Sequence, residues 1–481
     1  MNYAIVFRLL GYVLMIEGAL LLLPAAASLV YGEWMVLGVF LLTAAVSAGI
    51  GYALHTIKPR SKVFYMREGF AATSLCWVFI SVMGAVPFVL TGCIPNPVDA
   101  LFETVSGFTT TGASILPAVE GLPNGILFWR SFTHWIGGMG VLVFLLSLLP
   151  LTGGSHVNLM KAESPGPQVD KLVPKVQSTA KILYGIYFAL TVLELVFLLI
   201  GRMPLFEAML TAFGTAGTGG FGFRNDSFAS FSPYIQWVVT IFMILFGVNF
   251  NAYFLLLMRK FRRAAASEEV RGYFVVIVVA VGIITANIYS MYNSFGEALR
   301  QAAFQVGSII TTTGFSSCDF DLWPTLSKEI LVMLMFIGAC AGSTGGGIKV
   351  TTLFVCIWSA IAYTRNQHPT VFRRRFSQEV RDKALMIFLM GLSVVLVSTF
   401  LLCMLEPDAS FIQVLMETTS AFATVGLSCG LTGGLSGLSK LVLILTMYIG
   451  RLGPLTVATL WIVQGRRNSE ILRPEETISV G

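Results

Sequence analysis

The chain has 481 residues, of which 56% are hydrophobic and 12% charged, and its net charge is +6. Soluble proteins are typically about 45–50% apolar and about 25% charged, so this composition excludes a soluble enzyme, a disordered scaffold and a nucleic-acid binder. Crossing the hydrocarbon core of a bilayer takes about 20 residues. Several stretches without Asp, Glu, Lys or Arg reach that length, among them 35–57, 131–160, 227–258 and 384–405. The sequence therefore predicts an integral membrane protein.

The hydropathy pattern predicts ten transmembrane helices, at 9–30, 35–57, 70–92, 131–152, 182–200, 233–258, 273–293, 330–362, 384–405 and 441–463. An even number places both termini on one side of the bilayer. Of the 31 Lys and Arg residues, 23 lie in the termini or in the loops on that side. Because cytoplasmic loops carry the excess of basic residues, we expect a multi-pass protein of the cell inner membrane with both termini in the cytoplasm.

Four related segments follow the helices that end near residues 92, 200, 293 and 405. Each contains Thr-x-Gly, and three of them also carry a Glu or Gln nine residues before the glycine, at 102–112, 304–314 and 416–426. The second segment, 206–221, is about four residues longer, which one extra helical turn would explain. Its register has two readings, 215–217 and 218–220, and the match between Gly220-Phe221 and Gly314-Phe315 favours the second.

A second marker repeats with these segments. The helix after each one contains a large apolar residue followed by glycine, at Ile136-Gly137, Phe246-Gly247, Ile337-Gly338 and Ile449-Gly450. Because pseudo-repeats build transport paths, we expect an all-α fold with two N-terminal helices and four pseudo-repeats of helix, pore loop and helix around a central pore. The expected units are a two-helix N-terminal unit (1–66), pore repeats 1 to 4 (67–160, 161–262, 263–372, 373–465) and a cytoplasmic tail (466–481).

The repeated Thr-x-Gly has the chemistry of a cation path. A dehydrated cation inside a membrane needs oxygens to replace its water, because an uncompensated charge there is costly. Potassium channels supply backbone carbonyls from four loops of the type Thr-Val-Gly-Tyr-Gly. Glycine allows the positive φ that such a loop requires, and threonine can add a hydroxyl oxygen. The candidate ion-binding residues are Thr110, Thr111, Gly112, Thr218, Gly219, Gly220, Thr312, Thr313, Gly314, Thr424, Val425 and Gly426.

These loops, together with the stretches 338–349 and 448–456, resemble the Trk/Ktr/HKT superfamily of potassium transporters. The TrkH type is the best match, because the resemblance covers essentially the whole chain and includes two extra N-terminal helices. The resemblance implies a single-file potassium pathway with potassium as the transported ion. It also implies a homodimer, gated by a cytoplasmic nucleotide-binding partner of the TrkA type. We therefore expect no organic cofactor on this chain, a nucleotide on the partner, and no nucleic-acid ligand.

The second helix of the third repeat is interrupted by five glycines between Gly338 and Gly347. Each would cost roughly 0.5–1 kcal/mol in a helix interior. One reading is close helix packing through small residues. In the family this segment is an intramembrane loop that gates the path. We expect a movable barrier formed by Gly342, Ser343, Thr344, Gly345, Gly346 and Gly347.

Two basic residues lie inside apolar stretches. Arg451 interrupts an otherwise uncharged run, 441–465, and a charge at that depth normally faces a cavity or a partner. We expect its guanidinium to face the pore as a positive barrier, with a structural salt bridge or snorkelling as the alternative. Lys349 either closes the glycine-rich segment or snorkels to the interface.

Alternative functions leave more of the sequence unexplained. A sodium-coupled or sodium-permeable transporter would use the same loops, but Gly112 favours potassium, since serine at that position would favour sodium in plant relatives. A membrane enzyme is the least consistent reading, because no catalytic motif accompanies the fourfold repeat. Glu103, Glu207 and Glu417 either attract cations at the outer mouth or cap the pore helices.

Overall fold

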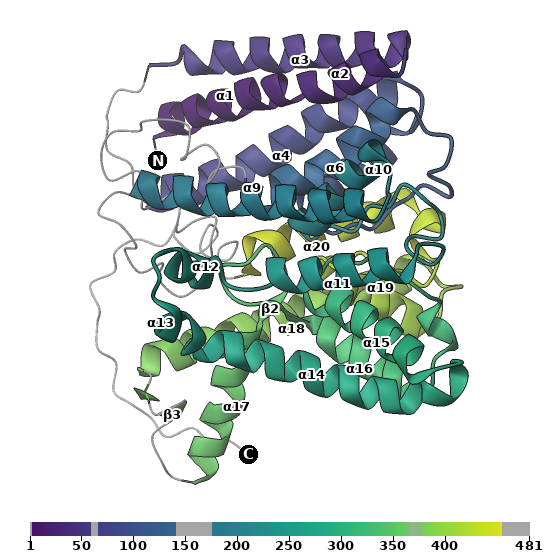
Figure 1. Cartoon of the computed structure of the whole chain (residues 1–481). Coiled ribbons are helices and arrows are strands. Elements are labelled where there is room, and N and C mark those ends of the chain that lie inside the picture. The colour runs from purple at the N-terminus through teal and green to yellow at the C-terminus, as the bar shows by residue number, and fades with distance from the viewer. Residues whose placement is uncertain are drawn as a thin grey trace, which may run out of the picture.

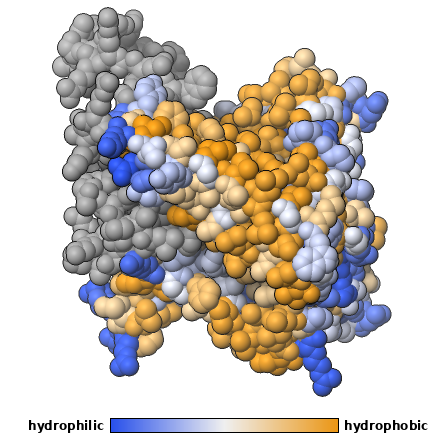
Figure 2. Space-filling model, turned by 90° about the horizontal axis from the view of Figure 1, so that it is seen from above, coloured by the Kyte–Doolittle hydropathy of each residue, from blue (hydrophilic) through white to orange (hydrophobic). Residues whose placement is uncertain are grey.

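The computed structural model describes residues 2–58, 66–140, 176–365, 370–371, 374–375 and 377–454. Long helices lie side by side with their axes in one general direction, and shorter segments fill the space between them (Figure 1). The fold is all-α, as the sequence predicts. Figure 2 shows apolar side chains over much of one face, with hydrophilic residues gathered toward its edges. Such a surface suits contact with lipid.

The N-terminal unit is a helical hairpin of α1 (Tyr3–Leu20), α2 (Leu22–Val30) and α3 (Trp34–His55). Helices α1 and α3 cross closely because each contributes a glycine at the contact: a methyl group on Gly51 would lie 2.7 Å from the carbonyl oxygen of Gly11. Close backbone approach through small residues is a common form of helix packing in membranes. The hydroxyl of Ser47 donates to the Leu14 carbonyl (2.9 Å) across the same contact.

Within the described residues, six helical spans are long and apolar enough to cross a membrane: Tyr3–Val30, Trp34–His55, Glu68–Leu90, Thr179–Ile200, Glu268–Met291 and Gln378–Leu405. The number becomes seven if α11 (Pro233–Phe246) and α12 (Phe250–Leu257), which are bent by 91°, are counted as one broken span. The expected spans 131–152 and 441–463 end outside the described residues. The count of ten therefore stays a prediction.

Four short helices precede the Thr-x-Gly loops: α5 (Pro97–Phe108), α10 (Leu205–Gly217), α15 (Phe295–Ile310) and α19 (Phe411–Ala423). The prediction of an extra turn in the second segment is wrong, because α10 has 13 residues, as α19 does, and the longest is α15 with 16. When the segments are aligned on the first threonine of each loop, the residue of α10 that corresponds to Glu103 is Thr211. Glu207 lies one helical turn closer to the start of α10.

The helices after the loops are α6 (Asn124–Gly138), α11 (Pro233–Phe246), α16 (Thr325–Phe336) and α20 (Gly437–Leu452). Their repeated glycines allow close approach to the short helices in two repeats. A methyl group on Gly137 would overlap the carbonyl oxygen of Phe108 at the end of α5, and one on Gly450 would overlap that of Phe422 in α19. This contact explains the second sequence marker in repeats 1 and 4.

Two of the expected spans are not continuous helices. Helix α11 ends at Phe246 and α12 (Phe250–Leu257) starts after the bend, where the Asn249 side chain caps it. In the third repeat, α16 ends at Phe336 and α17 (Val350–Thr364) begins after the glycines. The intervening chain is pinned by a parallel pair of two-residue strands, β1 (Ile337–Gly338) and β2 (Ile348–Lys349).

The remaining elements complete the bundle and its ends. They are α4 (Met66–Leu90), α9 (Val176–Ile200), α13 (Phe261–Ala265), α14 (Glu268–Ile288), α18 (Gln378–Leu405), the antiparallel pair β3 (Thr370–Val371) and β4 (Arg374–Arg375), and three 3-10 turns, Tyr289–Met291, Phe320–Leu322 and Thr432–Gly434. The N-terminus, α13 and β3 lie at the same end of the helices, on the left in Figure 1.

Candidate ion pathway

The four Thr-x-Gly loops share one backbone conformation. We number them loop 1 (110–112), loop 2 (218–220), loop 3 (312–314) and loop 4 (424–426). Their first residues have positive φ angles of 57°, 53°, 59° and 56°, and their glycines have φ of 82°, 78°, 84° and 79°. Among the described residues, seven non-glycine residues have positive φ, and four of them are these threonines. A left-handed β-branched residue is strained by roughly 1–3 kcal/mol, so repetition at four equivalent positions indicates a shared structural role.

The loops close into a ring in chain order. A methyl group on Gly112 would overlap the carbonyl oxygen of Gly219 in loop 2, and the same relation joins each loop to the next. The pairs are Gly112 with Gly219, Gly220 with Thr313, Gly314 with Val425, and Gly426 with Thr111. Backbone approaches this close leave no room for a side chain at any of the four glycines. The ring contains Gly220, so loop 2 has the 218–220 register.

The short helices end at the ring and hold its amides. In each repeat the middle residue of the loop donates its backbone N–H to a carbonyl in the last turn of the helix, at 2.8–2.9 Å: Thr111 to Ser106, Gly219 to Gly214, Thr313 to Ser308 and Val425 to Ser420. The C-terminal end of a helix carries a partial negative charge. Four such ends around one ring favour a cation and disfavour an anion.

A cavity of about 210 Å³ lies against the ring on one side, lined by Gly112, Gly220 and Gly314 and by residues that follow the loops. It has room for several water molecules. Arg224 also lines it, and its guanidinium lies 3.4 Å from the Glu207 carboxylate and 4.5 Å from the centre of the Phe231 ring. A hydrated ion could therefore lie next to the loops.

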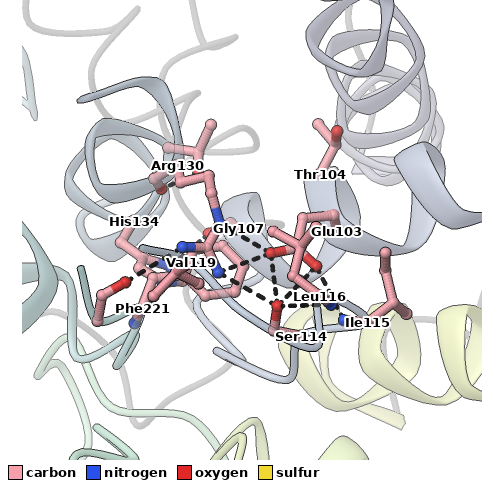
Figure 3. Close-up of polar contacts among 12 residues, drawn as sticks. Glu103, Thr104, Gly107, Ser114, Ile115, Leu116, Val119, Arg130, His134 and Phe221 are labelled. Carbon is pink, nitrogen blue, oxygen red and sulfur yellow. Dashed lines mark hydrogen bonds and ion pairs between the residues drawn. The ribbon is translucent and has the colours of Figure 1, made fainter. Parts of the chain in front are cut away.

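The three glutamates of the short helices have different surroundings. Figure 3 shows Arg130 pointing toward Glu103. Glu103 is fully buried, and its carboxylate lies 2.7 Å from the Arg130 guanidinium. Glu417 is also buried and accepts a hydrogen bond from the Thr432 hydroxyl. Only Glu207 lies in the first turn of its helix. Neither capping nor attraction of cations at the mouth explains Glu103, which instead holds the chain after loop 1 through Ser114 and Ile115.

The glycine-rich loop (339–347) lies against the threonine side of the ring. The N–H of Gly346 donates to the Thr312 hydroxyl (2.8 Å), and a methyl group on Gly346 would overlap the Thr424 hydroxyl. Lys349 turns back onto this loop, and its ammonium donates to the carbonyls of Gly345 and Gly346. It therefore closes the loop onto itself. Residues 342–347 thus touch loops 3 and 4 directly.

Arg451 joins the glycine-rich loop to loop 1. Its guanidinium donates to the Thr110 hydroxyl (3.1 Å), to the Thr344 carbonyl (3.0 Å) and to the carbonyls of Gly137 and Gly138. These bonds hold the guanidinium inside the protein, beside the threonine side of the ring. Snorkelling to the interface does not describe this position.

The structure adds two residues, Glu269 and Asn249, that the sequence does not identify as part of the site. The Glu269 carboxylate, in the first turn of α14, accepts hydrogen bonds from the N–H of Ala341 (2.6 Å) and from the Asn249 side chain (2.9 Å). At the same place the N–H of Phe250 donates to the Gly342 carbonyl (3.0 Å). Glu269 follows a basic loop and looks like an ordinary helix-start acid, so only the fold reveals its contact with the glycine-rich loop.

Comparisons with known proteins agree with this architecture. The family model described as "TrkH: Cation transport protein" matches residues 37–470. Two relatives, each called Trk system potassium uptake protein TrkH, come from Salmonella typhimurium (32% identical) and Escherichia coli K12 (30% identical), and each alignment covers 96% of this chain and 99% of the relative. The crystal structure of the potassium transporter TrkH from Vibrio parahaemolyticus superposes with a TM-score of 0.83 at 28% identity, over 96% of this chain and 98% of that one.

Proposed function

The chain belongs to the TrkH family of cation transport proteins, and from this premise we propose that it carries potassium ions across a membrane. It is a multi-pass transporter and not an enzyme. The single observation that carries the proposal is the ring, in which four loops of one conformation meet at the ends of four helices.

The ring acts as the selectivity filter. Carbonyl oxygens of the four loops replace the water of the ion, and the hydroxyls of Thr110, Thr218, Thr312 and Thr424 extend the oxygen-lined path. The strained threonines and side-chain-free glycines support this role, because a packed protein core has no need for four such loops. Sodium passage is the competing outcome.

The glycine-rich loop, with Lys349 and Arg451, acts as the gate. It lies against three of the four loops, through Thr312, Thr424 and the Arg451 contact with Thr110. The few hydrogen bonds of this loop can be broken and replaced by others at a modest cost in free energy. A continuous helix in the same place would have to unfold before it could move. The positive charge of Arg451 beside the path opposes cation passage until the loop moves.

Membership of the TrkH family also leads us to propose an orientation in the membrane and the partner subunits. The end of the bundle that carries α13 and the β3–β4 pair faces the cytoplasm of a cell inner membrane, and the arginines of α13 and β4 support this orientation. There a TrkA-like nucleotide-binding subunit regulates a homodimer of this chain. The names of the relatives, which assign them to a Trk system, support a multi-component assembly. The chain itself divides into the units 1–66, 67–160, 161–262, 263–372, 373–465 and 466–481.

Ion flux into liposomes tests the proposal. Purified protein is reconstituted, and potassium, rubidium, sodium and lithium gradients are applied in turn. We expect potassium and rubidium to pass and sodium and lithium to be excluded. Equal flux of potassium and sodium would refute the selective ring, and potassium-independent flux of sodium alone would favour the competing function.

A further inference from the structure

The contact between loops 1 and 2, which we call the seam, differs from the rest of the ring. Helix α6 places Arg130 and His134 one turn apart, so both side chains lie on the same helix face. Both are buried, with 2% and 0% of their surface exposed. Figure 3 shows them reaching from α6 toward Phe221, which directly follows loop 2.

His134 connects the two repeats through both nitrogens of its ring. The Phe221 N–H donates to Nε2 (3.2 Å), so the ring proton is on Nδ1, which donates to the Gly107 carbonyl (2.8 Å) in α5. The imidazole also lies 4.3 Å from the Phe221 ring, centre to centre. A single neutral side chain thus ties the helix before loop 1 to the backbone that leaves loop 2.

The same imidazole explains why loop 2 departs from the pattern of the others. The middle residue is Thr111, Thr313 or Val425 in loops 1, 3 and 4, but Gly219 in loop 2. A methyl group on Gly219 would overlap the ring atoms of His134. The imidazole of His134 therefore occupies the space that a side chain at position 219 would need.

The other repeats have no counterpart of this contact in sequence. His134 stands three residues before the repeated glycine of its helix, and the residues at that position in the other repeats are Ile244, Met335 and Met447. Four residues earlier, the counterparts of Arg130 are Thr240, Leu331 and Leu443. A buried histidine that served packing alone would need neither the Phe221 bond nor a glycine beside it.

We propose that His134 is a positioning residue that determines ion specificity, by fixing the carbonyls of loop 2 at the spacing that loop 1 requires. This rests on the proposed function of the ring. Loop 2 has no side chain at its middle position to pack behind it, so the histidine takes over that support. Losing it leaves the carbonyls of loop 2 free to close around a smaller cation.

The test compares variants that keep or lose each hydrogen bond. In liposome flux, His134→Leu should lower the potassium-to-sodium flux ratio about tenfold, because it removes both buried hydrogen bonds of the imidazole. His134→Gln, which keeps an acceptor for the Phe221 N–H, should recover most of the ratio. Met447→Leu, at the matching position of repeat 4, is the control and should leave the ratio unchanged, since it conserves volume.

A second pair of variants, at Gly219 and His134 together, distinguishes the proposed contact from misfolding of a single variant. Gly219→Thr alone should abolish uptake because of the overlap with the imidazole, and adding His134→Ala should restore part of it. Contacting residues that share one space give such non-additive effects. An unchanged ratio in folded His134→Leu would overturn the proposal. Failure of the wild-type protein itself to discriminate potassium from sodium would instead refute the proposed function.

Discussion

The seam between loops 1 and 2 and the contact of the glycine-rich loop with loops 3 and 4 hold the same ring in opposite ways. At the seam, buried side chains join the two repeats: Glu103 pairs with Arg130, and Arg130 also donates to the Gly222 carbonyl. Around loops 3 and 4, a backbone N–H of the glycine-rich loop donates to a threonine hydroxyl, and backbone carbonyls of that loop accept hydrogen bonds from Lys349 and Arg451.

This difference sets how far each side can move. Breaking a buried ion pair by removing one partner costs about 3–5 kcal/mol, whereas a hydrogen bond contributes about 0.5–1.5 kcal/mol net between neutral groups and about 1.5–3 kcal/mol when one group is charged. Under the proposed function, the seam is thus the fixed edge of the ring, and the glycine-rich loop is the side that moves away. In that proposal, one ring keeps its ion spacing while access to it is opened and closed.

The largest effect should come from a ring glycine. Gly314→Ala places a methyl group on the Val425 carbonyl oxygen and forces positive φ on alanine, so we expect potassium uptake to fall to background. Gly296→Ala, in the adjacent helix α15 with open space around it, is the matched control and should transport normally. Uptake by cells that lack other potassium transporters measures both. Normal uptake by Gly314→Ala would show that the ring is not the path.

Breaking the seam should destabilise the protein. Glu103→Gln leaves the buried Arg130 guanidinium without its counter-charge, and we expect a loss of about 3–5 kcal/mol in the free energy of unfolding. Glu207→Gln removes a partly exposed pair and should cost about 0–1 kcal/mol. Thermal unfolding in detergent compares the two melting temperatures. Equal melting temperatures would mean that the seam is not a fixed edge.

At the glycine-rich loop, Arg451→Ala should increase transport. A fixed positive charge beside the path costs a passing cation on the order of 1–2 kcal/mol at an effective dielectric constant near 20. Its removal should raise rubidium flux roughly tenfold. Equal or lower flux in a variant that folds and inserts normally would contradict the barrier.

The smallest expected effect concerns the attachment of the glycine-rich loop. In Glu269→Gln the amide can keep only one of the two hydrogen bonds, to Ala341 or to Asn249. Losing one such bond should raise rubidium flux about twofold to threefold. Glu268→Gln, the neighbouring residue in the same helical turn, is the control. A reduced flux would mean that Glu269 supports the open state instead.

The repeat was readable from the sequence because it is local and occurs four times. Thr-x-Gly and the downstream glycines indicated which residues meet, and the structure brings all four loops together. The predicted extra turn of the second segment is wrong because it depends on aligning Glu207 with Glu103 by residue type, whereas the register is set by distance from the loop threonine. The true counterpart, Thr211, has no carboxylate to reveal it.

The seam could not be read from the sequence, because its partners are far apart in the chain. The pairing of His134 with Phe221 spans 87 residues, and that of Arg130 with Gly222 spans 92. Gly219 differs from the middle residues of the other three loops, Thr111, Thr313 and Val425, without any local reason. The cause of this difference is a side chain from another repeat, which no local periodicity reports.

Anomalous diffraction from crystals grown in rubidium salt tests the central claim most directly, because it locates the ion without assuming a transport rate. The account predicts a rubidium peak on the axis of the ring, surrounded by the carbonyl oxygens of residues 110–112, 218–220, 312–314 and 424–426. A ring without rubidium, in crystals that hold the ion at another place within the membrane-spanning part, would contradict it.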